Sequence, residues 1–273
     1  IYMIKQAIIP LAGLGTRLLP LTSVFPKELL PINGKPGIEY ILDECIRAGI
    51  KEVIFIISKK KIMIKKYFYN DNFYKNIIKR KKDPRIISEY KKILKYKKMI
   101  KFVYQDKPLG TGDAVLKTKK FIKDKYFLML LPDDLIIKSN CSKSMIAIHK
   151  KFNSSVMASM KVNKKDVSRW GIYNVKKKIN NNNFVIKGVV EKPTVKMAPS
   201  CNAVIGRYIL PKTIFKKLSK LKPGSGGEIH ITDAIQSLIN GNDKFIAHNF
   251  FGKYLDCGTM KGYINSTLEV SKI

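Results

Sequence analysis

The alternation of short apolar segments with amphipathic ones is the feature that most constrains how this chain folds. Apolar segments long enough for one buried strand occur at residues 5–9, 53–57, 101–105 and 126–131. Segments with a helical pattern lie between and after them, at residues 37–48, from about residue 112, and near 142–152. Apolar strands separated by helices are typical of parallel sheets covered on both faces. We therefore expect an α/β fold with a mostly parallel central sheet flanked by helices.

The second half of the chain has a different pattern, with more strands and shorter connections. Strands are expected at residues 155–162, 171–175, 184–191, 203–210 and 245–251. Helices are expected near residues 212–218 and 228–239, and from about residue 259. The asparagine run at residues 180–183 predicts a hairpin turn. No internal repeat is visible, so we expect a single domain over residues 1–273.

The charge balance is strongly basic, and it raises the question of nucleic-acid binding. The chain has 53 Lys and Arg against 20 Asp and Glu, a formal net charge of +33. These cations are spread along the whole chain, and only residues 59–66 and 79–101 are locally dense. Such runs are typical of solvated helix faces or of a surface loop. We therefore expect attraction for anionic small molecules but no specific nucleic-acid partner.

Membrane insertion and a thiolate or imidazole metal centre both have little support. No apolar stretch approaches the roughly 20 residues that span a bilayer, and polar residues and Pro10 interrupt the first apolar segment, unlike a secretory signal. We expect a cytoplasmic protein. The four cysteines form no close pairs and the three histidines lie far apart, so the cysteines are expected to be reduced thiols and any metal to be bound by oxygen.

Candidate functional residues follow the predicted strands. In open parallel sheets, ligands bind beyond the carboxyl ends of the strands. Four features fall at such ends: the loop 11–17, Gln105 with the glycines after it, the segment 132–134 and the segment 191–193. They are predicted to share one crevice.

The loop 11–17 has the composition of an anion-binding loop. Gly13 and Gly15 allow the backbone to approach a ligand closely, and Arg17 adds a forked cation suited to a triphosphate. The loop is neither a dinucleotide fingerprint, because Leu18 occupies the third glycine position, nor a Walker loop. A plain strand-to-helix turn is the alternative interpretation. Lys27 follows Pro26, and prolines on both sides of its segment restrict its backbone, although an exposed turn cation would look the same.

Together these motifs resemble the sugar-nucleotide pyrophosphorylases, and among them the bacterial UTP–glucose-1-phosphate uridylyltransferases. The resemblance rests first on Leu-Ala-Gly-Leu-Gly-Thr-Arg-Leu at 11–18 and Pro-Lys-Glu-Leu-Leu-Pro at 26–31. Further matching motifs follow in order over nearly the whole chain, at residues 44–46, 131–133, 188–193, 204–208, 226–229, 232–235 and 256–258. The resemblance implies a Rossmann-like fold of the nucleotide-diphospho-sugar transferase type. It also implies Mg²⁺-assisted, in-line attack of glucose 1-phosphate on UTP, giving UDP-glucose and pyrophosphate.

The resemblance also assigns roles to individual residues. Those implied to be catalytic are Arg17, Lys27 and Asp133. Those implied to bind the nucleotide are Ala12, Gly13, Gly15, Gln105 and Gly110. Those implied to bind the sugar phosphate are Gly171, Glu191 and Lys192, and those implied to bind Mg²⁺ are Asp133 and Asp256. Asp134 is expected to point elsewhere, and Trp170 to serve in packing.

On this interpretation the nucleotide-binding half covers about residues 1–135 and the sugar-phosphate-binding half about 136–273, in a homo-oligomer that is a tetramer or dimer. Asp113 departs from the pattern, because the family more often has a histidine there. Two alternatives remain: a sister enzyme that uses dTTP or another sugar 1-phosphate, and, more remotely, a basic nucleic-acid-binding protein.

Overall fold

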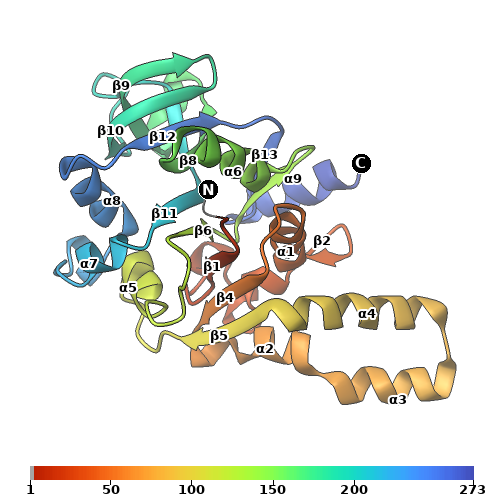
Figure 1. The fold of residues 1–273 in the computed structure, drawn as a ribbon. Helices are drawn as coiled ribbons and strands as arrows, with labels where there is room; N and C mark the ends of the chain where they lie inside the picture. Colours follow the sequence, from red (N-terminus) through yellow and green to blue (C-terminus); the bar gives the residue numbers. More distant parts are fainter. Residues whose placement is uncertain (1–2) are drawn as a thin grey trace.

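A computed structural model describes residues 3–273, and within them the largest element is a nine-stranded sheet (Figure 1). Its strands, in spatial order, are β5 (Ile100–Tyr104), β4 (Glu52–Ile57), β1 (Gln6–Pro10), β6 (Tyr126–Leu130), β11 (Asn202–Pro211), β8 (Ser155–Lys161), β12 (Phe245–Asn249), β10 (Asn183–Glu191) and β9 (Gly171–Asn180). Two small sheets pair β7 (Asp134–Ile137) with β13 (Lys253–Asp256) and β2 (Pro31–Ile32) with β3 (Lys35–Pro36).

The predicted α/β fold with a central sheet flanked by helices is confirmed, but the sheet is parallel only in part. The four strands β5, β4, β1 and β6 are parallel, as expected. Strand β11 is antiparallel to β6 and β8, and β10 is antiparallel to β12 and β9. The whole sheet is therefore mixed. A tight turn joins β9 to β10, and parallel neighbours would need a long crossover instead.

The alternation of side chains along each inner strand separates two hydrophobic cores. On β1, Ala7 and Ile9 belong to one core and Ile8 to the other. The first core is covered by α1 (Gly37–Arg47), α2 (Ile62–Tyr69), α4 (Pro84–Met99), α6 (Cys141–Phe152) and the end of α9 (Met260–Val270). The second is covered by α5 (Gly110–Leu116), α7 (Ile214–Leu218) and α8 (Ile231–Asn240).

The lysine-rich segments, which the sequence left open between helix and loop, are helical. Helix α3 (Asp71–Lys81) has no buried residue and projects beside α4 away from the sheet (Figure 1). Short 3₁₀ turns account for Thr16–Leu18, Leu21–Ser23, Lys27–Leu29, Lys59–Lys61, Lys164–Arg169 and Ser225–Gly227. Across residues 3–273, each helix is too short or too polar to cross a bilayer.

Two element boundaries differ from the prediction for local reasons. Strand β9 continues to Asn180, beyond the predicted end at residue 175, because it lies at the sheet edge where exposed lysines are tolerated. Helix α8 begins at Ile231 rather than near residue 228, because Gly226 and Gly227 have positive φ angles and Glu228 is extended. The predicted turn at residues 180–183 is confirmed, with the Asn182 amide donating to the Asn180 side chain at 3.0 Å.

One buried ion pair connects the helices to the centre of the sheet. Arg207 on β11 has a fully buried side chain, and its guanidinium donates to both carboxylate oxygens of Glu44 on α1 at 2.9–3.2 Å. Burial raises the pKa of Glu44, but the charge and hydrogen bonds of Arg207 and those of Ser142 outweigh it and hold the pKa below its ordinary value. The carboxylate therefore stays ionised in the interior.

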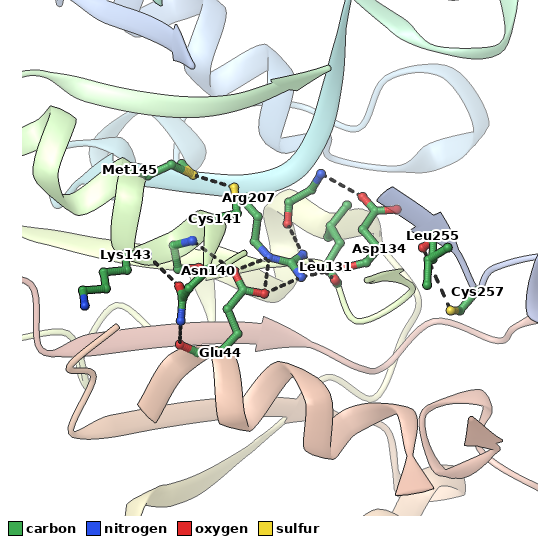
Figure 2. Close-up of polar contacts among 12 residues, drawn as sticks. Glu44, Leu131, Asp134, Asn140, Cys141, Lys143, Met145, Arg207, Leu255 and Cys257 are labelled. Carbon is green, nitrogen blue, oxygen red and sulfur yellow. Dashed lines mark hydrogen bonds and ion pairs between the residues drawn. The ribbon is translucent and has the colours of Figure 1, made fainter. Parts of the chain in front are cut away.

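The same guanidinium also holds the loop that follows β6. It donates to the backbone oxygens of Leu131 at 3.1 Å and Asp134 at 2.6 Å, as Figure 2 shows. These two residues flank Asp133. A structural ion pair thus sets the backbone position of one of the predicted catalytic residues.

We expect Arg207→Met to destabilise the fold by about 3–5 kcal/mol, because it leaves the Glu44 carboxylate buried without a cationic partner. Combining Glu44→Leu with Arg207→Met removes both charges, so the double variant should be clearly more stable than Arg207→Met alone. Both variants lose the contacts to Leu131 and Asp134. The difference between their free energies of unfolding, measured by urea denaturation, therefore reports the cost of the unpaired Glu44 charge. Equal stability of the two variants would contradict this account.

Candidate active site

A cavity of about 610 Å³ opens at the carboxyl ends of β1, β5 and β6. Its walls come from the loop after β1, from the segment that includes Gln105 and Gly110, and from Pro132 and Asp133. Three of the four predicted features therefore share one crevice. The fourth, Glu191 with Lys192, is exposed at the end of β10 and does not line this cavity.

The loop after β1 forms one wall with its backbone rather than with bulky side chains. Ala12, Gly13 and Gly15 all line the cavity. A Cβ atom added to Gly13 would meet no atom within 4 Å, so the space where a side chain would lie is open to the cavity. Gly15 is required for its left-handed conformation, with φ 71°, and its carbonyl accepts from the Thr22 hydroxyl at 2.8 Å. The loop continues as a single 3₁₀ turn that includes Arg17.

Asp133 lies where the predicted cations converge. The Lys27 ammonium is 2.7 Å from its Oδ2, and the guanidinium of Arg17, whose side chain is 62% exposed, is 3.4 Å from the same atom. Burial raises the pKa of Asp133, but the charge of Lys27, aided by that of Arg17, outweighs it and lowers the pKa below the ordinary value. The structure thus brings together all three residues predicted to be catalytic.

The second predicted carboxylate reaches the same place from the far end of the chain. Asp256 ends β13, which pairs with β7 directly after Asp133. The Cys257 amide donates to the Asp133 carbonyl, and the Gly258 amide to the Asp256 carboxylate, both at 2.8 Å. A Cβ on Gly258 would lie 2.8 Å from both Arg17 Nη2 and Asp133 Oδ2 and 3.1 Å from Asp256 Oδ1. The absence of that Cβ lets the guanidinium and the two carboxylates approach one another.

Two neighbouring carboxylates suit a hard, oxygen-seeking cation. Mg²⁺ is commonly held by one or two carboxylates, with phosphate and water oxygens completing its shell. Over residues 3–273, three or more His, Cys, Asp or Glu side chains gather nowhere in a way that could enclose a metal by themselves. The donor set therefore fits a cation that is shared with a bound phosphate ligand.

Asp134 points away from the cavity, as expected. Its carboxylate accepts from the Gly206 amide and from the Tyr254 hydroxyl, both at 2.7 Å. Burial and the neighbouring charge of Asp133 raise the pKa of Asp134 to about 6. The two adjacent aspartates thus have different environments: one is held among cations, and the other accepts hydrogen bonds from neutral donors.

A buried ion pair behind Lys27 was not predicted from the sequence. Glu28, which lines the cavity, is bound by the Lys61 ammonium at 2.7 and 2.8 Å, and both side chains are at most 9% exposed. The prediction that the whole 59–66 run is solvated is wrong for Lys61. The sequence signal that was missed is the spacing of Lys61, Ile64 and Phe68, which places all three residues on one buried helical face.

At the opposite wall, Gln105 and Gly110 line the cavity as predicted. The Gln105 amide donates to the Gly110 carbonyl at 3.1 Å. Gly110 has φ 91°, and an added Cβ would lie 2.6 Å from the Ile229 carbonyl oxygen, so only glycine fits there.

The residues predicted to bind the sugar phosphate form a separate group. A Cβ on Gly171 would lie 2.9 Å from a carboxylate oxygen of Glu191, so these two residues are adjacent. The Lys192 amide donates to the Trp170 carbonyl at 3.0 Å. Trp170 packs edge-on against Tyr254, with ring centroids 5.4 Å apart, which agrees with the predicted packing role.

Comparisons with known proteins agree with this arrangement. A model of the family described as nucleotidyl transferase matches residues 6–272. A putative UTP–glucose-1-phosphate uridylyltransferase of Methanocaldococcus jannaschii is 36% identical over 98% of this chain and 93% of its own length.

Two solved structures have the same fold over almost the whole chain. A UDP-glucose pyrophosphorylase complexed with UDP-glucose has a TM-score of 0.86 and 35% identity, covering 99% of both chains. A UTP-bound enzyme of the same kind from Acinetobacter baumannii has a TM-score of 0.89 and 33% identity, covering 98% of this chain and 93% of its own. With a cavity at the strand ends that brings Lys27 and Asp133 together, and a match over nearly its full length, this chain belongs to the nucleotidyl transferase family.

Proposed function

We propose that this protein transfers the uridylyl group of UTP to glucose 1-phosphate, forming UDP-glucose and releasing pyrophosphate. The observation that carries the proposal is the convergence of Arg17 and Lys27 on Asp133, which lines the cavity together with Lys27. The printed names of full-length relatives, and of solved structures bound to UTP and to UDP-glucose, support the choice of substrates.

The reaction we infer needs no covalent intermediate with the protein. A phosphate oxygen of glucose 1-phosphate attacks the α-phosphorus of UTP, a new P–O bond forms, and the bond to pyrophosphate breaks on the opposite side. Both reactants are anionic, so positioning and charge stabilisation dominate the catalysis. Arg17 and Lys27 stabilise the triphosphate as charge develops on the oxygens of the leaving pyrophosphate. The backbone of Gly13 and Gly15 allows the phosphates close approach.

Asp133 and Asp256 are the residues that would hold Mg²⁺. A bound Mg²⁺ supplies positive charge to the phosphate oxygens. In the structure the Lys27 ammonium forms an ion pair with Asp133. The carboxylate therefore has a cationic partner before the substrates bind.

The two substrates would occupy different ends of the site. Ala12, Gln105 and Gly110, within the half that covers about residues 1–135, would contact uridine. Gly171, Glu191 and Lys192, within the half that covers about 136–273, would bind glucose 1-phosphate, with Glu191 accepting from sugar hydroxyls and Lys192 binding the phosphate. Assembly into a dimer or tetramer stays a prediction.

The primary test is pyrophosphate release from the purified protein with Mg²⁺, glucose 1-phosphate and each of UTP, dTTP, ATP, CTP and GTP in turn. We expect a strong preference for UTP and a product with the mass of UDP-glucose. Preference for another nucleotide would contradict the base assignment, and preference for another sugar 1-phosphate would contradict the acceptor. Absence of release with every pair would contradict the proposed function as a whole.

Asp133→Asn should lower turnover by more than about 100-fold, because it removes the charge that attracts the metal and orders Lys27. The fold should persist, since the carboxylate is not part of the core. Asp106→Asn, at an exposed carboxylate outside the cavity lining, is the matched control and should behave like the wild type. Steady-state rates over a range of Mg²⁺ concentrations check this. Wild-type rates for Asp133→Asn at saturating Mg²⁺ would remove Asp133 from the metal site.

Lys192→Ala should raise the KM for glucose 1-phosphate by about 10-fold, the cost of one lost charged hydrogen bond, and leave the KM for UTP unchanged. Lys196→Ala removes an exposed lysine from the same loop and should change neither value. Initial rates with one substrate varied at a time measure both constants. An unchanged KM for glucose 1-phosphate in Lys192→Ala would place this lysine outside the site.

A further inference from the structure

The side-chain amide of Gln105 is held in one orientation by two acceptors. Its Nε2 donates to Asp113 Oδ2 at 2.8 Å and to the Gly110 carbonyl at 3.1 Å. These contacts use both hydrogens of the nitrogen. Gln105 and Asp113 are 4% and 6% exposed, so the contact between them is shielded from water. Among residues 3–273, no group donates to the remaining polar atom, Oε1, which is not sealed from solvent.

The chemistry of the two acceptors fixes which end of the amide faces them. An ionised carboxylate and a backbone carbonyl can only accept hydrogen bonds, so the nitrogen of Gln105 must point toward them and its oxygen must point away. The Lys117 ammonium lies 3.5 Å from the other carboxylate oxygen of Asp113, Oδ1. A reversed amide would place an oxygen against two acceptors.

Asp113 is itself held in place by the backbone. It lies in the first turn of α5, whose start is tied to the segment before α8 by two hydrogen bonds. The Gly112 amide donates to the Ile229 carbonyl at 2.7 Å, and the Ile229 amide donates to the Leu109 carbonyl at 2.8 Å. A Cβ on Gly112 would lie 2.8 Å from the Ile229 carbonyl oxygen, so the approach is close. The carboxylate therefore has a fixed position from which to orient Gln105.

We propose that Asp113 is a positioning residue that determines base specificity, by presenting Gln105 to the nucleotide as an obligate hydrogen-bond acceptor. This inference rests on the proposed function and deepens it. An acceptor at this wall of the cavity suits a base that carries a ring N–H, such as uracil with its N3–H. It opposes cytosine, whose N3 is itself an acceptor. The pair of residues therefore selects UTP over CTP, although Asp113 need not contact the base.

Asp113→Leu tests this role, because leucine has a similar branched shape but accepts no hydrogen bond. We expect the ratio of kcat/KM for UTP to that for CTP to fall at least about 10-fold, mostly through a higher KM for UTP. The KM for glucose 1-phosphate should not change. A purely structural role would instead lower both nucleotide efficiencies together and leave their ratio unchanged, which would overturn the proposal.

Asp113→Asn is the conservative variant, since its amide oxygen can still accept from Gln105. We expect it to retain most of the preference for UTP. Asp43→Asn is the matched control, because Asp43 is a partly buried carboxylate that accepts from Tyr96 at 2.7 Å, outside the cavity lining. It should leave the UTP-to-CTP ratio unchanged. Loss of the preference in Asp113→Asn to the same extent as in Asp113→Leu would contradict the role of the acceptor oxygen.

A double-mutant cycle tests whether Asp113 acts through Gln105. In a Gln105→Ala background, Asp113→Leu should cause no further change in the UTP-to-CTP ratio, whereas independent effects would add. Additivity would overturn the proposal. Measurements on the wild type distinguish this inference from the proposed function. Absence of turnover by the wild type would refute the function. If the wild type prefers UTP but Asp113→Leu has the same UTP-to-CTP ratio, only the role of Asp113 is refuted.

Discussion

The buried pair of Glu44 and Arg207 is the interaction on which the rest of the site depends. An arginine at the centre of the sheet is compatible with folding only if its charge and its donors are satisfied, because desolvating an unpaired ion costs several kcal/mol. Glu44 balances the charge, and the remaining donors bind backbone oxygens on both sides of Asp133. The requirement to satisfy one buried guanidinium thus joins α1, β11 and the loop after β6.

Charge balance also organises the cavity side of that loop. Asp133 is partly buried and ionised because Lys27 and Arg17 are close to it, while Asp134 faces inward and is held by neutral donors. Lys27 is the first residue of a 3₁₀ turn, and the buried ion pair of Glu28 with Lys61 anchors that turn. Lys27 and Asp133 are therefore each held by a structural ion pair nearby, Glu28 with Lys61 and Glu44 with Arg207. For a reaction between two anions, this arrangement provides fixed cations without large rearrangement when ligands bind.

The contrast between the two walls of the cavity explains how one site can combine catalysis with base recognition. Arg17 and Lys27 are proposed to bind phosphates, which all nucleoside triphosphates share, so these two residues do not distinguish one base from another. The wall formed by Gln105 and α5 presents polar groups to the ligand, and there the proposed orientation of a single amide distinguishes one base from another.

The amino-acid sequence alone determined the inner strands, several of the helices that cover them, including α1, α5 and α6, and most of the residues at the strand ends that line the cavity. These features follow from local periodicity and from glycine and proline geometry, which act over a few residues. Tertiary structure decided the rest. The antiparallel placement of β11, the burial of Lys61, and the meeting of Asp133 with Asp256 depend on residues far apart in the chain. Such contacts arise from the need to satisfy buried charges and backbone groups together, and no local pattern records that requirement.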